Sequence, residues 1–236
     1  YIKFNYAINL DIILTEIKSS DVGNELKKLG YWNELYSKEN YFGTGQTILA
    51  NSAKELIDKY SIQKILELGC GQGRDSVFFA KYGYDVTATD ISENAINFVE
   101  KIKDKNDLKN LNLFVHDTKN SFDFLNEKFD LVYSNLALQF FDLSQLNNIF
   151  SRIHNIMNQN SFFLFSTKKP GDKYFNFGNK ISDYAFEYKG ITRFFFESNQ
   201  IQDILKDYFD IIFFEEDEHV NFDGTKSVWW KILVRK

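Results

Sequence analysis

The feature that most constrains the fold of this chain is a glycine-rich segment that directly follows a short apolar run. The segment reads Glu67-Leu-Gly-Cys-Gly-Gln-Gly-Arg74, and the apolar run covers residues 64–68. An apolar run that ends at glycines predicts a buried strand followed by a tight loop. The next residues predict a helix over 75–82, with Gly83 as its stop. A strand, a glycine loop and a helix in this order are typical of α/β proteins that bind nucleotide-like ligands.

Predicted strands and helices alternate through the middle of the chain. The sequence predicts strands over residues 84–89, 112–115, 129–134 and 161–167, and helices over 92–104 and 143–157. This alternation favours parallel strands with helices on both faces, which is a doubly wound α/β sheet. A helix over 198–208 follows. Two last strands, over 210–216 and 227–234, are joined by a polar loop that suits an antiparallel hairpin.

Two segments outside this alternation are expected to border a site. Helices over 25–36 and 46–60 enclose an aromatic loop at 41–45, and residues 169–192 are predicted to be irregular and are rich in aromatic side chains. We find no linker or repeat and predict one domain over 1–236. Its parts are a helical cap (1–60), a core (62–168), a lid or substrate insertion (169–197), and a closing helix with a β-hairpin (198–236).

Composition and charge argue against several classes of function. The formal net charge of −5 disfavours a broad nucleic-acid-binding surface, which requires a basic face. The single cysteine, Cys70, permits no internal disulfide and fits a reducing cytoplasm. Residues 1–11 are apolar but interrupted by Lys3, Asn5 and Asp11, so we expect no signal peptide. No apolar run is long enough to span a membrane.

The glycine loop itself predicts a binding site for an anionic group. Gly69, Gly71 and Gly73 allow a tight turn and close backbone approach, and the following helix presents unpaired N–H groups and a positive dipole end. A dinucleotide fingerprint needs G-x-G-x-x-G or G-x-G-x-x-A, and Arg74 stands at the sixth position. The loop therefore favours a different adenosine-containing ligand.

Two acidic residues extend this site. Asp90 lies about twenty residues beyond the loop at the end of the next predicted strand, where a carboxylate can accept both ribose hydroxyls. Asp117 follows the third predicted strand in the same way and would reach the adenine amino group. The alternatives are structural, because Asp is also a common helix N-cap and a common first residue of a turn before Thr118.

These residues resemble class I S-adenosyl-L-methionine-dependent methyltransferases. The segments Ile65–Asp75 and Gly83–Asp90 look most like the tellurite-resistance and thiopurine branch of small-molecule methyltransferases, and the resemblance covers residues 62–168. It implies a Rossmann-like sheet of seven strands with the last strand antiparallel. It also implies methyl transfer from S-adenosyl-L-methionine to a small-molecule acceptor by direct in-line displacement, giving S-adenosyl-L-homocysteine.

The resemblance also implies roles for individual residues. Relatives tend to have Asn at the position of Asp75 and often have His at the position of Gln139, so this chain departs from the pattern at both. The implied cofactor-binding residues are Glu67, Gly69, Cys70, Gly71, Gly73, Arg74, Asp90, Ile91, Asp117, Thr118, Asn135 and Leu136.

No catalytic residue is assigned from the sequence. The sulfonium already activates the methyl group, so a general base is needed only if the acceptor arrives protonated. Tyr133 and His116 are weak candidates for that base, with strand packing and an exposed or core histidine as the structural alternatives. No metal site is predicted.

The acceptor side is expected among the aromatic segments. An aromatic wall suits a flat or apolar acceptor. Four cationic side chains lie near the same edge and either receive an anionic acceptor or form solvated surface: Lys168, Lys169, Lys173 and Arg193. The candidate acceptor-binding residues are Tyr31, Trp32, Tyr41, Phe42, Gln139, Phe175 and Arg193.

Two other classes of function stay open from the sequence. One is a protein or nucleic-acid methyltransferase. Ser134-Asn-Leu-Ala137 stands where enzymes that methylate base amines have an Asn/Asp-Pro-Pro-aromatic signature, which argues against a nucleic-acid partner. The other is a non-catalytic cofactor-binding module or a nucleotide-dependent oxidoreductase. We expect a cytoplasmic monomer or homodimer with no membrane partner.

Overall fold

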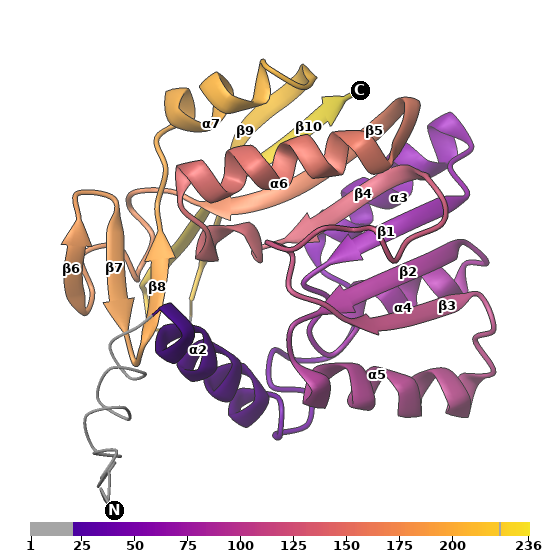
Figure 1. Ribbon diagram of the computed structural model, residues 1–236, viewed down its shortest axis with the longest axis horizontal. Coiled ribbons are helices and arrows are strands. Elements are labelled where there is room, and N and C mark those ends of the chain that lie inside the picture. The colour runs from indigo at the N-terminus through magenta and orange to yellow at the C-terminus, as the bar shows by residue number, and fades with distance from the viewer. Residues whose placement is uncertain (1–20, 222) are drawn as a thin grey trace, which may run out of the picture.

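A seven-stranded sheet forms the centre of the computed structural model, which describes residues 21–221 and 223–236 (Figure 1). The strand order is β3-β2-β1-β4-β5-β10-β9. The strands are β1 (Lys64–Leu68), β2 (Asp85–Asp90), β3 (Leu111–Val115), β4 (Phe129–Asn135), β5 (Met157–Lys168), β9 (Asp210–Val220) and β10 (Lys226–Arg235). The first five are parallel, and β10 runs antiparallel to both of its neighbours. The predicted α/β fold with an antiparallel last strand is confirmed.

Helices cover both faces of this sheet. They are α3 (Ile48–Tyr60), α4 (Arg74–Lys81) and α5 (Glu93–Asn106) on one face, and α6 (Leu143–Ile156) and α7 (Ser198–Leu205) on the other. Ile57 of α3 and Phe79 of α4 share a buried cluster with Ile65 of β1. Phe150 of α6 lies in a second cluster with Leu66 of β1. Successive strand side chains point to opposite faces, so a strand covered on both sides needs a continuous apolar run.

The segment after β5 contains a second, three-stranded sheet, which corrects the expectation of irregular structure over 169–192. Its antiparallel strands are β6 (Asn179–Ser182), β7 (Ala185–Tyr188) and β8 (Ile191–Phe194). Lys189 and Gly190 join β7 to β8, and their φ angles of 54° and 76° suit a type I′ hairpin turn. Sequence patterns do not reveal these strands because four residues are too few to show an alternation, and Lys-Gly is a weaker turn signal than Asn-Gly.

Two additions lie beyond the carboxyl ends of β1, β2 and β4 (Figure 1). One is α2 (Asp21–Leu35), and the other is the three-stranded sheet. A short 3-10 helix after β4, η1 (Leu138–Phe140), contacts β8 and links the two sheets. Open α/β sheets bind ligands at the carboxyl ends of their strands, so both additions border the expected site.

Two expectations from the sequence concern membranes. Over residues 21–221 and 223–236, no helix is both long and apolar enough to cross a bilayer. The expectation that no signal peptide is present concerns residues 1–11, which lie outside the described residues.

Candidate active site

A cavity of about 420 Å³ opens at the carboxyl ends of the central strands. All predicted cofactor-binding residues line it except Gly73, and all predicted acceptor-binding residues line it except Phe175. Of the two candidate bases, His116 lines the cavity and Tyr133 does not. Within the part of the chain that the structure describes, no cluster of three or more His, Cys, Asp or Glu side chains could hold a metal ion.

The glycine loop needs glycine for both its backbone angles and its neighbours. Gly69, Gly71 and Gly73 have φ of 70°, 53° and 73°, in the left-handed region that side chains disfavour. A Cβ on Gly69 would lie 2.4 Å from the Cβ of Ala137. A Cβ on Gly73 would lie 2.7 Å from Cγ2 of Val99 in α5. The third glycine therefore serves helix packing, which explains why Gly73 does not line the cavity.

Asp90 is a buried carboxylate on the wall of the cavity, at the predicted ribose position. Its Oδ2 accepts a hydrogen bond of 2.8 Å from the Gly71 amide, and its Oδ1 accepts one of 2.9 Å from the Ser92 amide. Burial raises the pKa of Asp90 to about 6, although both amides favour the ionised form. A carboxylate offers about four acceptor positions, so Asp90, which lines the cavity, keeps acceptor capacity for a ligand beyond its backbone donors.

Glu67 supports the loop from below. The Ser76 hydroxyl in α4 donates a hydrogen bond to Glu67 Oε2, which joins the end of β1 to the helix after the loop. Burial and the nearby Asp75 carboxylate raise the pKa of Glu67 well above its ordinary value. This side chain therefore acts as a structural hydrogen-bonding group at the base of the cavity.

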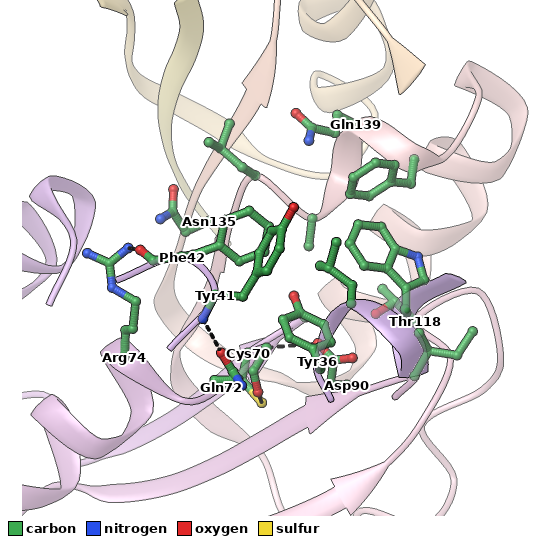
Figure 2. Close-up of a pocket in the computed structure, with 18 of the residues that line it drawn as sticks. Tyr36, Tyr41, Phe42, Cys70, Gln72, Arg74, Asp90, Thr118, Asn135 and Gln139 are labelled. Carbon is green, nitrogen blue, oxygen red and sulfur yellow. Dashed lines mark hydrogen bonds between the residues drawn. The ribbon is translucent and has the colours of Figure 1, made fainter. Parts of the chain in front are cut away.

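Arg74 and Gln72 hold the aromatic loop that precedes α3 (Figure 2). Arg74 Nε donates to the Gly45 carbonyl at 2.7 Å, and one terminal nitrogen donates to the Phe42 carbonyl at 2.8 Å. Gln72 accepts from the Tyr41 amide at 2.8 Å. Arg74, one of the implied cofactor-binding residues, lines the cavity and directs these two donors to the loop. Gln72 was not singled out from the sequence.

Tyr133 is buried beneath this region and is linked to the loop. Its hydroxyl donates to Asp75 Oδ2 at 2.6 Å and lies 3.1 Å from the Thr47 hydroxyl. Asp75 also accepts from the Thr47 amide and hydroxyl, each at 2.7 Å. Burial raises the pKa of Tyr133 well above its ordinary value. A buried neutral phenol away from the cavity is a poor general base.

The predicted adenine side lies at the end of β3. Asp117 Oδ1 accepts from the Lys119 amide at 3.0 Å, which is the turn that the sequence left as an alternative to ligand binding. The side chain still lines the cavity beside the buried Thr118. His116 packs against Phe124 at 4.6 Å between ring centroids, and its Nε2 is buried with no partner among the described residues.

Tyr36, just after α2, is a cavity residue that the sequence analysis did not identify. Its hydroxyl is the atom that a Cβ on Gly71 would meet, at 2.8 Å. Burial and the Asp90 carboxylate raise the pKa of Tyr36 well above its ordinary value. Its ring stacks on Trp32 at 6.0 Å, and this i, i+4 spacing was the available sequence signal. Figure 2 shows Tyr36 close to Cys70 and Asp90.

The other end of the cavity is formed by η1 and the three-stranded sheet. The guanidinium of Arg193 in β8 lies 4.9 Å from the Tyr174 ring and 5.7 Å from the Phe140 ring. Gln139 is buried on the cavity wall, on the side away from Asp90 (Figure 2). Phe175 packs instead against Phe186 and Phe195, at 5.3 and 5.5 Å, inside the insertion, which corrects its predicted place on the acceptor wall.

Comparison with known proteins identifies the family. The sequence matches the family described as "Tellurite resistance protein TehB" over residues 34–218, which is more than half of the chain. The chain belongs to the TehB family. The resemblance to the tellurite-resistance branch is therefore confirmed.

One relative that is similar in sequence carries the TehB name. A "Probable S-adenosyl-L-methionine-dependent methyltransferase TehB" of Haemophilus influenzae (strain 10810) is 30% identical over 129 residues. That match covers 54% of this chain and 44% of the relative, so the chain spans less than half of the relative's length.

Two solved structures share the architecture. The crystal structure of TehB from Haemophilus influenzae has a TM-score of 0.61 at 22% identity and covers 79% of this chain and 62% of that one. The N-methyltransferase NodS from Bradyrhizobium japonicum WM9, solved with S-adenosyl-L-homocysteine, has a TM-score of 0.65 at 12% identity and covers 89% and 98%. At these identities the likeness concerns the fold.

Proposed function

We propose that this chain transfers the methyl group of S-adenosyl-L-methionine directly to a small-molecule acceptor, leaving S-adenosyl-L-homocysteine. The observation that carries the proposal is the hydrogen bond between the Gly71 amide and the buried Asp90 carboxylate at the wall of an open cavity. Family membership supports it, because the Haemophilus influenzae relative is named a probable S-adenosyl-L-methionine-dependent methyltransferase.

The residues of the cavity fit this cofactor. Asp90 lines the cavity and keeps acceptor capacity that can receive a ribose hydroxyl. Asp117 and Thr118 border the cavity where the adenine is expected, and Gly69 and Cys70 border the expected methionine portion. We propose these residues as the cofactor site, in the part of the chain over 62–168.

The reaction mainly requires the chain to orient the acceptor relative to the methyl group. When bound, the cofactor supplies a methyl group that its sulfonium has already activated. Alignment of the acceptor alone contributes roughly 7–11 kcal/mol. Asn135 and Leu136 border the cavity after β4, and both bind the Ser166 hydroxyl, which donates to Asn135 Oδ1 at 2.7 Å and accepts from the Leu136 amide at 2.9 Å. We propose that this rigid wall orients the acceptor.

The walls of the cavity favour a small acceptor. α2, the loop that Arg74 holds and the three-stranded sheet all contribute to the lining. A protein or nucleic-acid substrate needs an open face instead. We further propose one domain over 1–236, with residues 1–60 as cap, 169–197 as acceptor wall and 198–236 as closing segment, acting as a monomer or homodimer in the cytoplasm.

Calorimetric titration with S-adenosyl-L-methionine, S-adenosyl-L-homocysteine and NAD tests the proposed cofactor. We expect both sulfur ligands to bind and NAD to fail. Absence of binding by either sulfur ligand would refute the proposal. An assay for S-adenosyl-L-homocysteine release over thiols, amines, phenols, carboxylates and oxyanions then separates an enzyme from a non-catalytic binding module, and a protein or oligonucleotide arm tests the macromolecular alternative.

A further inference from the structure

Charge is divided unevenly around the cavity. The four carboxylates that line it, Glu67, Asp75, Asp90 and Asp117, lie in or after β1, β2 and β3, or in α4. Three cationic side chains line the other end, on β5 and the segment that follows it. They are Lys168, Lys173 and Arg193. Lys28 and Arg74 also line the cavity, so positive charge is not confined to this end; what distinguishes this end is that none of the lining carboxylates lies there.

Only one of these three cations forms an ion pair among the described residues. Lys168 is buried and forms an ion pair with Asp172. The same carboxylate also accepts from the Val228 amide at 2.9 Å and from the Tyr174 amide at 3.0 Å. Three donors, the Lys168 ammonium and the Val228 and Tyr174 amides, thus occupy the Asp172 carboxylate, and no ion pair joins it to Lys173 or Arg193 among the described residues. Lys173 interacts electrostatically with Asp223, whereas Arg193 keeps its charge available to a ligand.

Arg193 is held in place without any carboxylate. The Tyr174 ring at 4.9 Å and the Phe140 ring at 5.7 Å flank its guanidinium. Over residues 21–221 and 223–236, no hydrogen bond or ion pair occupies its side-chain nitrogens. A guanidinium fixed by rings presents its donors in a planar fork, which matches a carboxylate or a similar anion.

The surroundings of Arg193 are flat and apolar. Phe140 packs edge-on against Trp32 at 4.9 Å, so the rings of Trp32, Phe140 and Tyr174 continue along one wall. Gln139 beside them is buried, and its side-chain oxygen has no partner in the described parts of the chain. An unpaired buried amide costs free energy unless a ligand satisfies it. The site therefore combines a cation, an aromatic wall and an unused polar group.

We propose that the acceptor is a small organic anion with a flat apolar body, whose anionic group binds Arg193 and whose ring or plane lies along Trp32, Phe140 and Tyr174. The inference deepens the proposed function and rests on it. A lone pair of the acceptor forms the new bond to the methyl carbon, and the carbon–sulfur bond breaks with its electrons left on sulfur. Any proton on the attacking atom leaves to solvent. Arg193 selects the substrate and takes no part in bond making.

Equilibrium binding to the protein loaded with S-adenosyl-L-homocysteine tests this assignment. The probes are 2-mercaptobenzoate, its neutral isostere 2-mercaptobenzamide, and selenite as an inorganic anion. We expect the benzoate to bind at least about tenfold more tightly than either of the others, since hydrogen bonds between two charged groups are stronger than those that involve a neutral amide. In Arg193→Gln this preference over the amide should fall below about threefold. Arg193→Lys should restore part of it.

A matched control distinguishes a specific role of Arg193 from a general disturbance of the three-stranded sheet. Lys180 in β6 belongs to the same small sheet, is exposed, pairs with Asp183 and does not line the cavity. Lys180→Gln should leave the preference unchanged. The inference is overturned if benzoate and benzamide bind equally, if selenite binds more tightly, or if no probe binds. In each of these cases a normal affinity for S-adenosyl-L-homocysteine leaves the proposed cofactor intact. Loss of S-adenosyl-L-homocysteine binding by the unmodified chain would instead refute the proposed function.

Discussion

The Gly71 amide donates a 2.8 Å hydrogen bond to Oδ2 of Asp90, and this bond joins the loop after β1 to the end of β2. Asp90 is buried, so its charge depends on the few donors that surround it. The same carboxylate faces the cavity. One side chain therefore organises the loop and offers the remaining acceptor positions to a ligand, and its two roles can be measured separately.

Replacing Asp90 by Asn should weaken binding of S-adenosyl-L-homocysteine about 10- to 100-fold, because hydrogen bonds to a charged group contribute about 1.5–3 kcal/mol. Calorimetry measures the affinity, and thermal unfolding checks that the variant is folded. Asp85→Asn, at the opposite end of β2 and away from the cavity, is the control and should bind normally. Unchanged affinity in Asp90→Asn would exclude the ribose role.

Cofactor affinity should depend on pH through Asp90, whose pKa is about 6. The ionised carboxylate accepts hydroxyl donors, so affinity should be constant above about pH 6 and fall by up to tenfold per unit below it. The pKa of Asp90 in the folded chain lies above its ordinary value of 3.8. The ionised carboxylate therefore lowers the free energy of unfolding above about pH 6, and this loss of stability disappears as the pH falls from about 6 toward 3.8. Titrations of the unmodified chain and Asp90→Asn between about pH 5 and pH 8 test this. Identical profiles would contradict it.

Gly73→Ala should destabilise the fold by about 2–4 kcal/mol, because it combines a left-handed φ with a clash against Val99. Gly83→Ala is the matched control, since its φ of 90° has no neighbour within 4 Å of an added Cβ. Gly83→Ala should lower the free energy of unfolding only by the cost of the left-handed backbone, about 1–2 kcal/mol. Chemical denaturation measures both. Equal losses would mean that contact with α5 does not require this glycine.

Tyr133→Phe should keep the turnover number within about threefold and lower stability by about 1 kcal/mol, the usual net value of one hydrogen bond. Asp75 still accepts from the Thr47 amide and hydroxyl in this variant. The methyltransferase assay and thermal unfolding give the two values. A fall in turnover of about a hundredfold, with the fold intact, would restore Tyr133 as the catalytic base.

Arg74→Ala should affect the local stability of the aromatic loop more than the affinity for the cofactor, since Arg74 donates to the Phe42 and Gly45 carbonyls. Hydrogen exchange over 37–47 should rise by at least about tenfold if about 1.4 kcal/mol of local stability is lost. Arg235→Ala on β10, at the opposite end of the sheet, is the control. Strong loss of S-adenosyl-L-homocysteine affinity with unchanged loop exchange would point to direct contact with the ligand carboxylate.

The amino-acid sequence by itself determined the seven-stranded sheet and which residues line the proposed cofactor half of the candidate site. Continuous apolar runs such as 64–68 and the alternation of helix and strand patterns are local properties, and they specify a strand buried on both faces. The spacing from Gly71 to Asp90 equals one helix and one strand, so a parallel arrangement brings the two together without further information.

Only the tertiary structure decided which side chains meet around the candidate active site. β6, β7 and β8 are too short to leave a periodic signal, and their pairing depends on contacts between strands. The roles of Arg74, Tyr133 and Gly73 depend on partners at Gly45, Asp75 and Val99. Arg193 is far in sequence from Phe140, and no local pattern predicts that its charge lies between two rings. Such contacts come from packing, which local sequence patterns do not encode.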